Sequence, residues 1–228
     1  MTASRSPNIP RCPTRDEIDT APRQSIVAGT GGKADVFSIP VDGVRVLVKD
    51  FRPRGFVARQ LGRFQIGRES AAYATLTGMA GVPAFAGRID AYALAIEFIE
   101  AERLAFAEVR PADGPTLIAK LRTIVDDLHA RGIIHNDLRG RENVLLTKDG
   151  NLVVIDFAAA VHLTPGGLTH RLFFRFLSMA DEAAFLKWKG MIAPGSYTSE
   201  DVAFLARFER WRALWPFNPK RRKSARAA

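Results

Sequence analysis

The chain has 228 residues, of which 47% are hydrophobic, so it is long enough for one large or two small lobes around an apolar core. The only cysteine, Cys12, excludes an intrachain disulfide framework and a cysteine metal cluster, which favours a reducing compartment. The N-terminal residues and the short apolar runs fit neither a secretory signal nor a bilayer span. We therefore expect a cytoplasmic protein.

The net charge of +9 is concentrated in part at the end of the chain, where the segment KRRKSARAA carries five cations. We assign residues 217–228 to a basic tail. The tail could be a solvated end that aids solubility, or it could contact nucleic acid or an anionic membrane, and the membrane contact would place the protein at the inner membrane. We do not expect a nucleic-acid partner.

Residues 1–24 contain four prolines and no periodicity, which predicts a disordered leader outside the fold. From residue 25 the runs SIVAG, ADVFSIP and RVLVKDF, with an Asp-Gly turn between the last two, predict three strands. A helix is predicted from Phe56 to Met79, most clearly from Arg68 onward, because Gly62 and Gly67 weaken its first half. Two short strands follow, around AFAGRI and AYALAIEFI.

The second half begins with an amphipathic helix from about Pro115 that ends at HARG, where Gly132 suits the left-handed position after a helix. The segment IIHNDLRGRENVLL comes next, and its end predicts a strand, VLLT. A KDG turn then leads to a second strand, LVVID. Residues from about 168 to 215 predict two or three helices. Their aromatic and leucine side chains are more typical of a core than of a lipid surface: Phe173, Phe174, Phe176, Leu177, Trp188, Trp211 and Trp215.

A glycine-rich loop lies between the first two predicted strands, where Gly29, Gly31 and Ala34 occupy a GxGxxG pattern and Val36 follows. Such a loop in a hairpin is typical of a flap whose amides lie over phosphates, although by itself it equally fits an ordinary hairpin. Lys49 ends an apolar strand, and Glu69 lies 20 residues later on the clearest part of the helix. Paired with that carboxylate, the Lys49 amine would suit the α and β phosphates of ATP.

Three polar side chains follow elements that predict a common rim: Asp137 and Asn143 after the amphipathic helix, and Asp156 at the end of an apolar strand. Magnesium prefers hard oxygen ligands, few of them from protein, so Asn143 and Asp156 can hold Mg²⁺ against phosphates. Asp137 is then free to orient an acceptor hydroxyl. Burying even a neutral polar group without a partner costs roughly 2 to 7 kcal/mol, so Asp156 should have a ligand or a partner.

Taken in order, GTGGKADV, VLVK, Glu69, IIHND with Asn143, and IDFA resemble the protein kinase-like superfamily over residues 25 to about 165. The resemblance implies a bilobal α+β fold: an N-lobe at 25–99, with a small antiparallel sheet and one helix, and a reduced, mainly helical C-lobe at 100–216. For the nucleotide, the resemblance implies that Lys49 and Glu69 form the ion pair on ATP and that the backbone of Glu97 to Ile99 is the hinge that binds adenine. For the transfer, it implies Asp137 as the base, Asn143 and Asp156 as magnesium ligands, and Arg139 near the γ-phosphate. His135 would hold the catalytic loop against the Asp156 turn. For Arg139, a plain surface arginine is an equal alternative.

Four departures narrow the resemblance. Five residues instead of four separate Asp137 from Asn143, so one must bulge if Asn143 is to reach metal. Asn136 replaces the arginine that clamps a phosphorylated activation loop. No APE motif follows, and Ala158 replaces the glycine of DFG. These features resemble the atypical short bacterial and archaeal branch, the RIO-type and lipopolysaccharide core sugar kinases.

The leading hypothesis is an ATP- and magnesium-dependent kinase that phosphorylates a hydroxyl of a protein serine or threonine or of an envelope sugar. The alternative is a pseudokinase, a nucleotide-binding scaffold without turnover, which the longer loop and missing activation segment favour. A third hypothesis, drawn from the basic tail, is a binding protein on ribosomes or nucleic acid.

Overall fold

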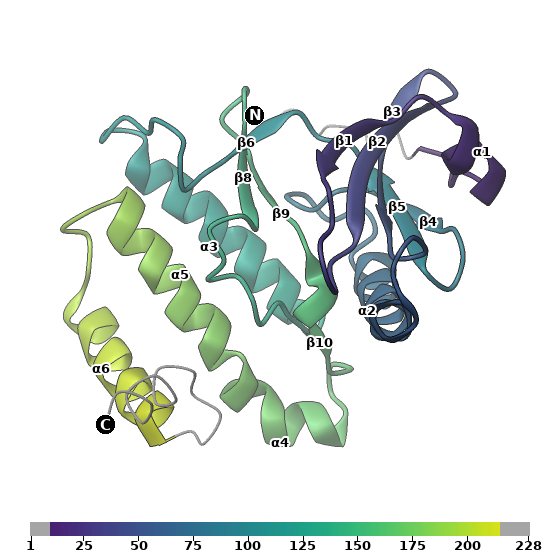
Figure 1. Cartoon of the computed structure of the whole chain (residues 1–228). Coiled ribbons are helices and arrows are strands. Elements are labelled where there is room, and N and C mark those ends of the chain that lie inside the picture. The colour runs from purple at the N-terminus through teal and green to yellow at the C-terminus, as the bar shows by residue number, and fades with distance from the viewer. Residues whose placement is uncertain (1–9, 215–228) are drawn as a thin grey trace, which may run out of the picture.

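The structure is a computed structural model that describes the backbone of residues 10–214 and the side chains of residues 10–210. The basic tail and Trp215 lie outside these ranges, as does the side chain of Trp211. Figure 1 shows two parts, a twisted sheet with one long helix and a group of helices with short strands, joined where β5 leads into β6.

The larger sheet has five strands in the order β1-β2-β3-β5-β4, and every neighbouring pair is antiparallel. Its strands are β1 (Gln24–Val27), β2 (Asp35–Val41), β3 (Val44–Asp50), β4 (Phe85–Arg88) and β5 (Ala93–Glu97). The three-strand meander and the two later strands are therefore confirmed. Because β3 is the central strand, Lys49 does not lie at a sheet edge.

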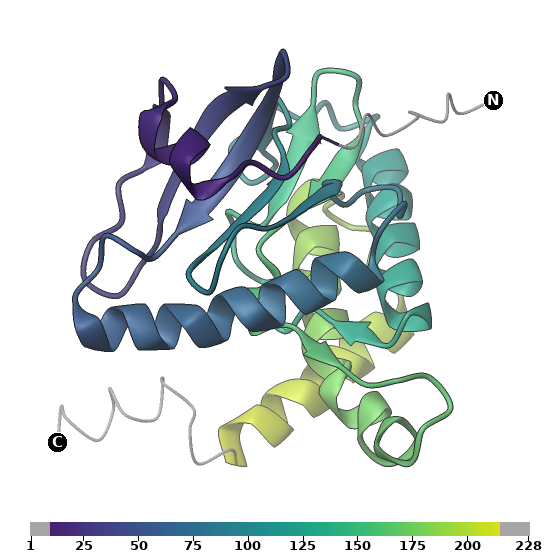
Figure 2. The ribbon, with the colours of Figure 1, turned by 90° about the vertical axis from the view of Figure 1, so that its right-hand side faces the viewer.

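The predicted helix between these strands is α2 (Phe56–Thr75), which runs across one side of the sheet in Figure 2. Gly62 does not interrupt it. A Cβ atom at Gly62 would lie 2.2 Å from the ring of Phe51, a side chain that is only 1% exposed. The glycine lets this ring pack directly on the helix, and burial of the ring offsets the weak helix propensity of glycine.

The second part contains four helices and two small sheets within the described residues. The helices are α3 (Gly114–Ala130), α4 (Leu168–Leu177), α5 (Met179–Ile192) and α6 (Ser199–Leu214). The strands are β6 (Ala101–Arg103), β8 (Val144–Thr147) and β9 (Leu152–Val154) in one sheet, and β7 (Ile133–Ile134) with β10 (Val161–His162) in the other. β6, β7 and β10 were not predicted, because strands of two or three residues show no periodicity.

The amphipathic pattern of α3 determines how the second part packs. Its six predicted apolar side chains are all buried and join a core that includes α2 and α5: Leu117, Ile118, Leu121, Ile124, Val125 and Leu128. Gly132 has φ +72°, and a Cβ there would lie 2.1 Å from the carbonyl oxygen of Leu163. Both the left-handed backbone and the close contact require glycine, as predicted.

The leader prediction is wrong for residues 10–24. They form α1 (Arg15–Thr20), which lies against the sheet in Figures 1 and 2. Its Ile18 is fully buried in a second core with side chains of the sheet. Thr14 and Glu17 form a capping box, and Arg15 pairs with Asp50 and Asp90. Six helical residues are too few for a periodic signal, so the prolines dominated the prediction.

The core assignment of the C-terminal aromatics is only partly correct. Trp188 is 2% exposed, whereas Phe173 is 53% and Phe176 39% exposed on α4. Their pattern is amphipathic, but these two side chains stay far more exposed than Trp188, so helical spacing alone misassigned them. Across residues 10–214, no helix combines the length and the hydropathy that a membrane crossing needs.

Candidate active site

A charged centre lies between the sheet, α2 and the end of β9. Lys49 pairs with Val36 of β2 on one side and with Leu94 of β5 on the other, so its strand is fixed. Its Nζ donates to Glu69 Oε2 at 2.8 Å and to Asp156 Oδ1 at 2.9 Å. The predicted pair is therefore a triad, in which one ammonium joins carboxylates from two parts of the molecule.

Burial and charge act in opposite directions on this triad. Burial lowers the pKa of the Lys49 ammonium, but attraction by Glu69 and Asp156 outweighs burial and raises the pKa above its ordinary value of 10.5. Burial raises the pKa of Glu69 more than Lys49 lowers it. Burial also raises the pKa of Asp156, but Lys49 outweighs it and the net pKa is lowered. Lys49 is thus a fixed cation, and Glu69 protonates before Asp156.

The turn at Asp156 is held in an unusual backbone conformation. Asp156 has φ 65° and ψ 73°, the left-handed region, and precedes the 3₁₀ helix η1 (Phe157–Ala159). A non-glycine residue there costs of order 1 to 3 kcal/mol, so neighbouring contacts must hold it. One such contact comes from Arg68 of α2, whose Nη2 donates to the carbonyls of Ala159 at 3.0 Å and Ala160 at 2.7 Å. This role of Arg68 was not predicted from the sequence.

The segment after β7 presents Asp137 beside Asn143. Asn143 is buried, and its Nδ2 donates to the Asp137 carbonyl at 2.8 Å and to Asp137 Oδ2 at 3.1 Å. The extra residue is absorbed by two successive turns, closed by the Gly140 amide on the Asp137 carbonyl and by the Asn143 amide on the Gly140 carbonyl. The longer spacing therefore does not move Asn143 away from Asp137.

His135 and Asn143 also tie Asp137 to the strand that carries Asp156. The fully buried imidazole of His135 accepts at Nδ1 from the Asp137 amide at 3.3 Å and contacts the Ile155 carbonyl through Nε2 at 3.0 Å, which assigns the proton to Nε2. The Ile155 amide in turn donates to the Asn143 carbonyl at 3.0 Å. The two aspartates are thus held on the same rim by short chains of bonds. The bracing position predicted for His135 agrees with these contacts.

Asp181, which was not predicted from the sequence, holds this loop against α5. Asp181 of α5 is 1% exposed and accepts from the amides of His135 at 2.7 Å and Asn136 at 2.8 Å, and it lies 3.2 Å from His129 Nε2. Seven residues later, Trp188 donates from Nε1 to the Leu138 carbonyl at 2.9 Å. Asn136, at φ 63°, depends on such support.

The sequence does contain one sign of Asp181. Asp181 shares a helical stripe with Ala184, Phe185 and Trp188, at steps of three, four and seven residues, and all four side chains are buried. A lone carboxylate in an apolar stripe requires a buried partner. The stripe does not identify the partner, because main-chain amides have no sequence signature.

The glycine-rich loop joins β1 to β2 next to Lys49. Gly29 has no room for a side chain, because its Cβ would lie 2.4 Å from the Ala34 carbonyl oxygen, and its amide donates to Asp35 Oδ1 at 2.8 Å. Arg54 pairs with Asp35 and donates to the Gly29 carbonyl at 2.6 Å. Gly31 at the loop tip has φ +61° and open space around it. Ala34 is buried, and Val36 is the residue opposite Lys49 in the sheet.

The predicted hinge lies at the end of β5. The Glu97 amide and carboxylate both bond Ala84, the amide donating to the Ala84 carbonyl at 2.8 Å and Oε2 accepting from its amide at 3.1 Å. The Phe98 amide faces the Arg45 carbonyl at 3.4 Å. The Ile99 amide has no acceptor among residues 10–214, so it remains available to a ligand.

Cations gather beside Asp137. Arg139 is exposed, and its carbonyl accepts from Lys187 Nζ at 3.1 Å. Burial lowers the pKa of Lys187, and the charges of Arg139 and Arg141 lower it further. The Arg139 guanidinium makes no ion pair with a described carboxylate, so its charge is directed to solvent at the rim.

A column of rings connects the loop to the sheet through the Asp156 turn. Phe157 lies 4.9 Å from His135 and 5.1 Å from Tyr73, and Tyr73 stacks 6.0 Å from Phe85 (ring centroids). All but Phe85 are at most 1% exposed. The column holds α2, the turn and the catalytic loop in one core, which keeps both Glu69 and Asp156 within hydrogen-bonding distance of Lys49.

This arrangement, a five-stranded antiparallel sheet with one helix above a helical part and a Lys-Glu-Asp triad between them, is the fold of the protein kinase-like superfamily. The structure is similar to that of the Rio2 kinase from Chaetomium thermophilum, described as an ADP/Mg²⁺-phosphoaspartate complex. The TM-score is 0.54 at 15% identity, covering 86% of this chain and 73% of that one. The predicted fold class is thereby confirmed, and the similarity supports a RIO-like architecture without identifying a bacterial branch.

In sequence, a segment of 47 residues is 47% identical to the serine/threonine-protein kinase PKH3 of Saccharomyces cerevisiae. The segment is 21% of this chain and 5% of the yeast protein, so the chain spans only a small part of that relative. No family model matches the chain. The structural similarity shows a kinase-like fold, and the sequence match is a short kinase-like segment.

Proposed function

We propose that this protein is an ATP-dependent phosphotransferase that transfers the γ-phosphate to an alcohol group. The observation that carries the proposal is the Lys49 ammonium held by two carboxylates, Glu69 on α2 and Asp156 at the end of β9. A purely structural ion pair would need one carboxylate. The second, which is 44% exposed at its side chain, faces open space where a metal-bound phosphate can lie.

The nucleotide would lie between the glycine-rich loop and the hinge. Gly29 and Gly31 allow backbone amides to approach the phosphates, and Ala34 and Val36 lead the strand that faces Lys49. The unbonded Ile99 amide and the Glu97 carbonyl would receive adenine. The arrangement does not distinguish ATP from GTP.

The donor set beside Asp156 fits magnesium. Lys49 occupies Asp156 Oδ1, which leaves Oδ2 without a described partner, and Asn143 uses its Nδ2 on Asp137, which leaves Oδ1. Two hard oxygens suit Mg²⁺ that also binds phosphate oxygens. Within residues 10–210 there is no group of three His, Cys, Asp or Glu side chains able to hold a metal ion without such help. When bound, Mg²⁺ would neutralise charge on the phosphates.

Asp137 would be the catalytic base. Its Oδ2 accepts from Asn143, which orients the carboxylate, and the other oxygen would take the proton of an acceptor hydroxyl. The acceptor oxygen then bonds the γ-phosphorus as the bond to the β–γ bridging oxygen breaks, which releases ADP. Arg139 would approach the transferred phosphate from the exposed rim. A protein serine or threonine and an envelope sugar such as the lipopolysaccharide core both remain acceptors to test.

We further propose that the protein acts in the cytoplasm, in part at the inner membrane. The basic tail, residues 217–228, would contribute attraction to anionic lipid there.

Labelled ATP with magnesium, alone and with a cell-envelope extract, tests the proposal. Asp137→Asn should lower turnover by about 10² to 10⁴ with nucleotide affinity retained, because the base acts only in transfer. Asp156→Asn should also weaken magnesium-dependent nucleotide binding. Asp149→Asn, in the exposed turn between β8 and β9, is the matched control. Nucleotide binding without consumption on any acceptor would instead favour the pseudokinase alternative.

A further inference from the structure

Helix α4 exposes one apolar side along most of its length. None of its ten residues is buried, although the sequence LTHRLFFRFL is strongly amphipathic. The exposed fractions are 72% for Leu168, 62% for Leu172, 53% for Phe173 and 39% for Phe176. Four large apolar side chains on one short helix are unusual on a water-facing surface.

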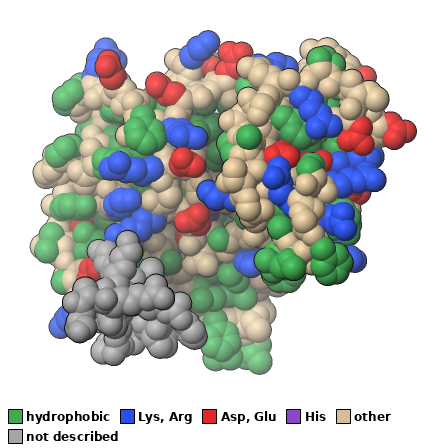
Figure 3. Space-filling model, in the orientation of Figure 1, with side chains coloured by type: hydrophobic (Ala, Val, Ile, Leu, Met, Phe, Trp, Pro, Cys, Tyr) green, Lys and Arg blue, Asp and Glu red, His purple; other side chains and the backbone are tan. Residues whose placement is uncertain are grey.

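The first half of α2 has the same character. Phe56, Val57, Leu61 and Phe64 are 61% to 71% exposed. In Figure 3, green hydrophobic side chains gather on the lower edge of the molecule, on the right where α2 lies and at the bottom where α4 lies. Arginines rather than acidic residues accompany both.

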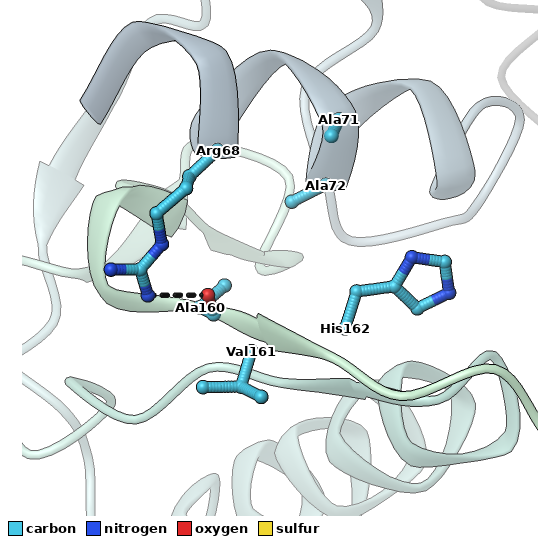
Figure 4. A pocket seen from close by; sticks show the side chains of 6 residues that line it. All are labelled: Arg68, Ala71, Ala72, Ala160, Val161 and His162. Atoms are coloured by element: carbon cyan, nitrogen blue, oxygen red, sulfur yellow. Dashed lines mark hydrogen bonds between the residues drawn. The ribbon is translucent and has the colours of Figure 1, made fainter. Parts of the chain in front are cut away.

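Two hollows lie along α2, and neither is lined by a residue of α4. One, of about 610 Å³, is lined by residues that include Arg63, Phe64, Arg68 and Arg88. The other, of about 320 Å³, is shown in Figure 4 and is lined by Arg68, Ala71, Ala72, Ala160, Val161 and His162. Both hollows share Arg68 and Ala71, and the second ends at β10, five residues before α4. We call the exposed part of α2, the hollows and α4 the α2–α4 surface.

No acidic residue contributes to this surface. The sequence has no Asp or Glu from Phe51 to Arg68 or from Phe157 to Ala180, and neither hollow is lined by a carboxylate. The same two segments carry seven arginines: Arg52, Arg54, Arg59, Arg63, Arg68, Arg171 and Arg175. Two of them already have partners, since Arg54 pairs with Asp35 and Arg68 donates to the carbonyls of Ala159 and Ala160. Both segments lack acidic residues although the whole chain has 24 aspartates and glutamates.

We propose that the α2–α4 surface docks on an anionic phospholipid bilayer. Phe and Leu side chains at this exposure bury well at the boundary between headgroups and acyl chains, and arginines can lay their methylene stems there while the guanidinium groups meet lipid phosphates. A carboxylate at that depth would be repelled by the negative surface, which accounts for the composition of both segments. The proposal concerns residues other than the basic tail and does not depend on phosphoryl transfer.

Vesicle flotation with the full chain tests the proposal. The probes are vesicles of phosphatidylcholine alone and of phosphatidylcholine with about 30 mol% phosphatidylglycerol. The double variant Leu172→Ser/Phe173→Ser should need about tenfold more anionic lipid for half binding, and Phe56→Ser/Leu61→Ser should have an effect in the same direction. Phe106→Ser is the matched control, because Phe106 is 64% exposed in the loop after β6, outside this surface.

The changed side chains are all solvent-exposed, so circular dichroism melting should show folded variants. Arg171→Gln/Arg175→Gln should reduce binding to the anionic vesicles and leave binding to neutral ones unchanged. Equal binding of the wild type and the α4 variant would overturn the proposal. So would binding that is lost only when residues 217–228 are deleted, since the tail alone would then carry it. A concentration-dependent dimer that the α4 variant abolishes, without vesicle binding, would assign the surface to a second copy of the chain.

Discussion

Glu69 and Asp181 are both buried carboxylates, each at most 2% exposed, but they serve the candidate site in different ways. Glu69 meets a cation, Lys49, whose other partner is Asp156. Asp181 meets the backbone amides of His135 and Asn136. The first carboxylate fixes a charge that faces the nucleotide, and the second fixes the path of the loop that carries Asp137.

This difference separates chemistry from geometry within one site. The Lys49–Glu69 ion pair should affect turnover more than folding, provided that both of its charges are removed together. A main-chain anchor on the α5 side should control folding and, through it, the position of the base. The predictions below test this division.

The largest effect is expected for Lys49→Met, which removes the phosphate-binding amine and should lower turnover by about 10² to 10³. It also leaves Glu69 as a buried carboxylate without its cation, which costs about 3 to 5 kcal/mol of unfolding free energy. Turnover with labelled ATP and urea unfolding measure the two losses separately.

The double variant Lys49→Met/Glu69→Gln is the matched control for that change. It should recover most of the lost stability, because the fully buried carboxylate is now neutral and only the half-exposed Asp156 lacks its cation, but none of the lost turnover. Recovery of both would mean that Lys49 acts on the fold alone.

The second effect is on the α5 side. Asp181→Ala leaves the buried His135 amide and the half-buried Asn136 amide without an acceptor, and we expect a loss of about 3 kcal/mol of unfolding free energy in urea. Hydrogen exchange should accelerate at the His135 and Asn136 amides before it does elsewhere in the core. Asp126→Ala removes a carboxylate that is 63% exposed and pairs with Arg122, so it should cost no more than about 1 kcal/mol. Similar losses for Asp181 and Asp126 would contradict the anchoring role.

The same comparison explains what sequence reasoning could find. Lys49, Glu69 and Asp156 are recognisable because an apolar strand, a helix and a second apolar strand each carry a charge that needs a partner. The five-stranded sheet, α2 and α3 follow from long periodic runs. Asn143 was harder to place, because the turns that absorb the extra residue at Gly140 depend on backbone bonds.

The remaining features depend on contacts that leave no local pattern. Asp181 and Arg68 bind carbonyls and amides, which every residue possesses. α1 is stabilised by Ile18 against the sheet and by Arg15 on Asp50 and Asp90, over separations of tens of residues. The exposed face of α4 has the same spacing as a buried one, so periodicity alone cannot tell whether another element covers it.

A smaller loss of stability is expected at Trp188, which binds the same loop as Asp181 through one hydrogen bond. Trp188→Phe keeps an aromatic ring in the core but removes the Nε1 donor to the Leu138 carbonyl, for a loss of about 1 to 2 kcal/mol in urea unfolding. Because Leu138 follows Asp137 directly, turnover should fall further than nucleotide affinity. Equal falls in both would indicate a general loss of folded protein instead.

The smallest effect concerns pH and separates the two carboxylates of the Lys49 triad. The folded pKa of Glu69 is raised above its ordinary 4.5 by burial, so its contribution to stability is fully present below pH 4.5 and is lost as pH rises through the folded pKa. The folded pKa of Asp156 lies below its ordinary 3.8 through its pairing with Lys49, so its contribution is present above pH 3.8 and is lost as pH falls through the folded pKa.

The Glu69→Gln variant removes only the pH dependence that comes from Glu69. Between pH 4.5 and neutrality the free energy of unfolding of Glu69→Gln should therefore rise relative to the wild type. Urea titrations across this range measure the difference, and Glu108→Gln, an exposed change, should run parallel to the wild type. A Glu69→Gln curve that also ran parallel would show that Lys49 offsets the burial of Glu69 completely, so that ionisation of Glu69 neither stabilises nor destabilises the fold.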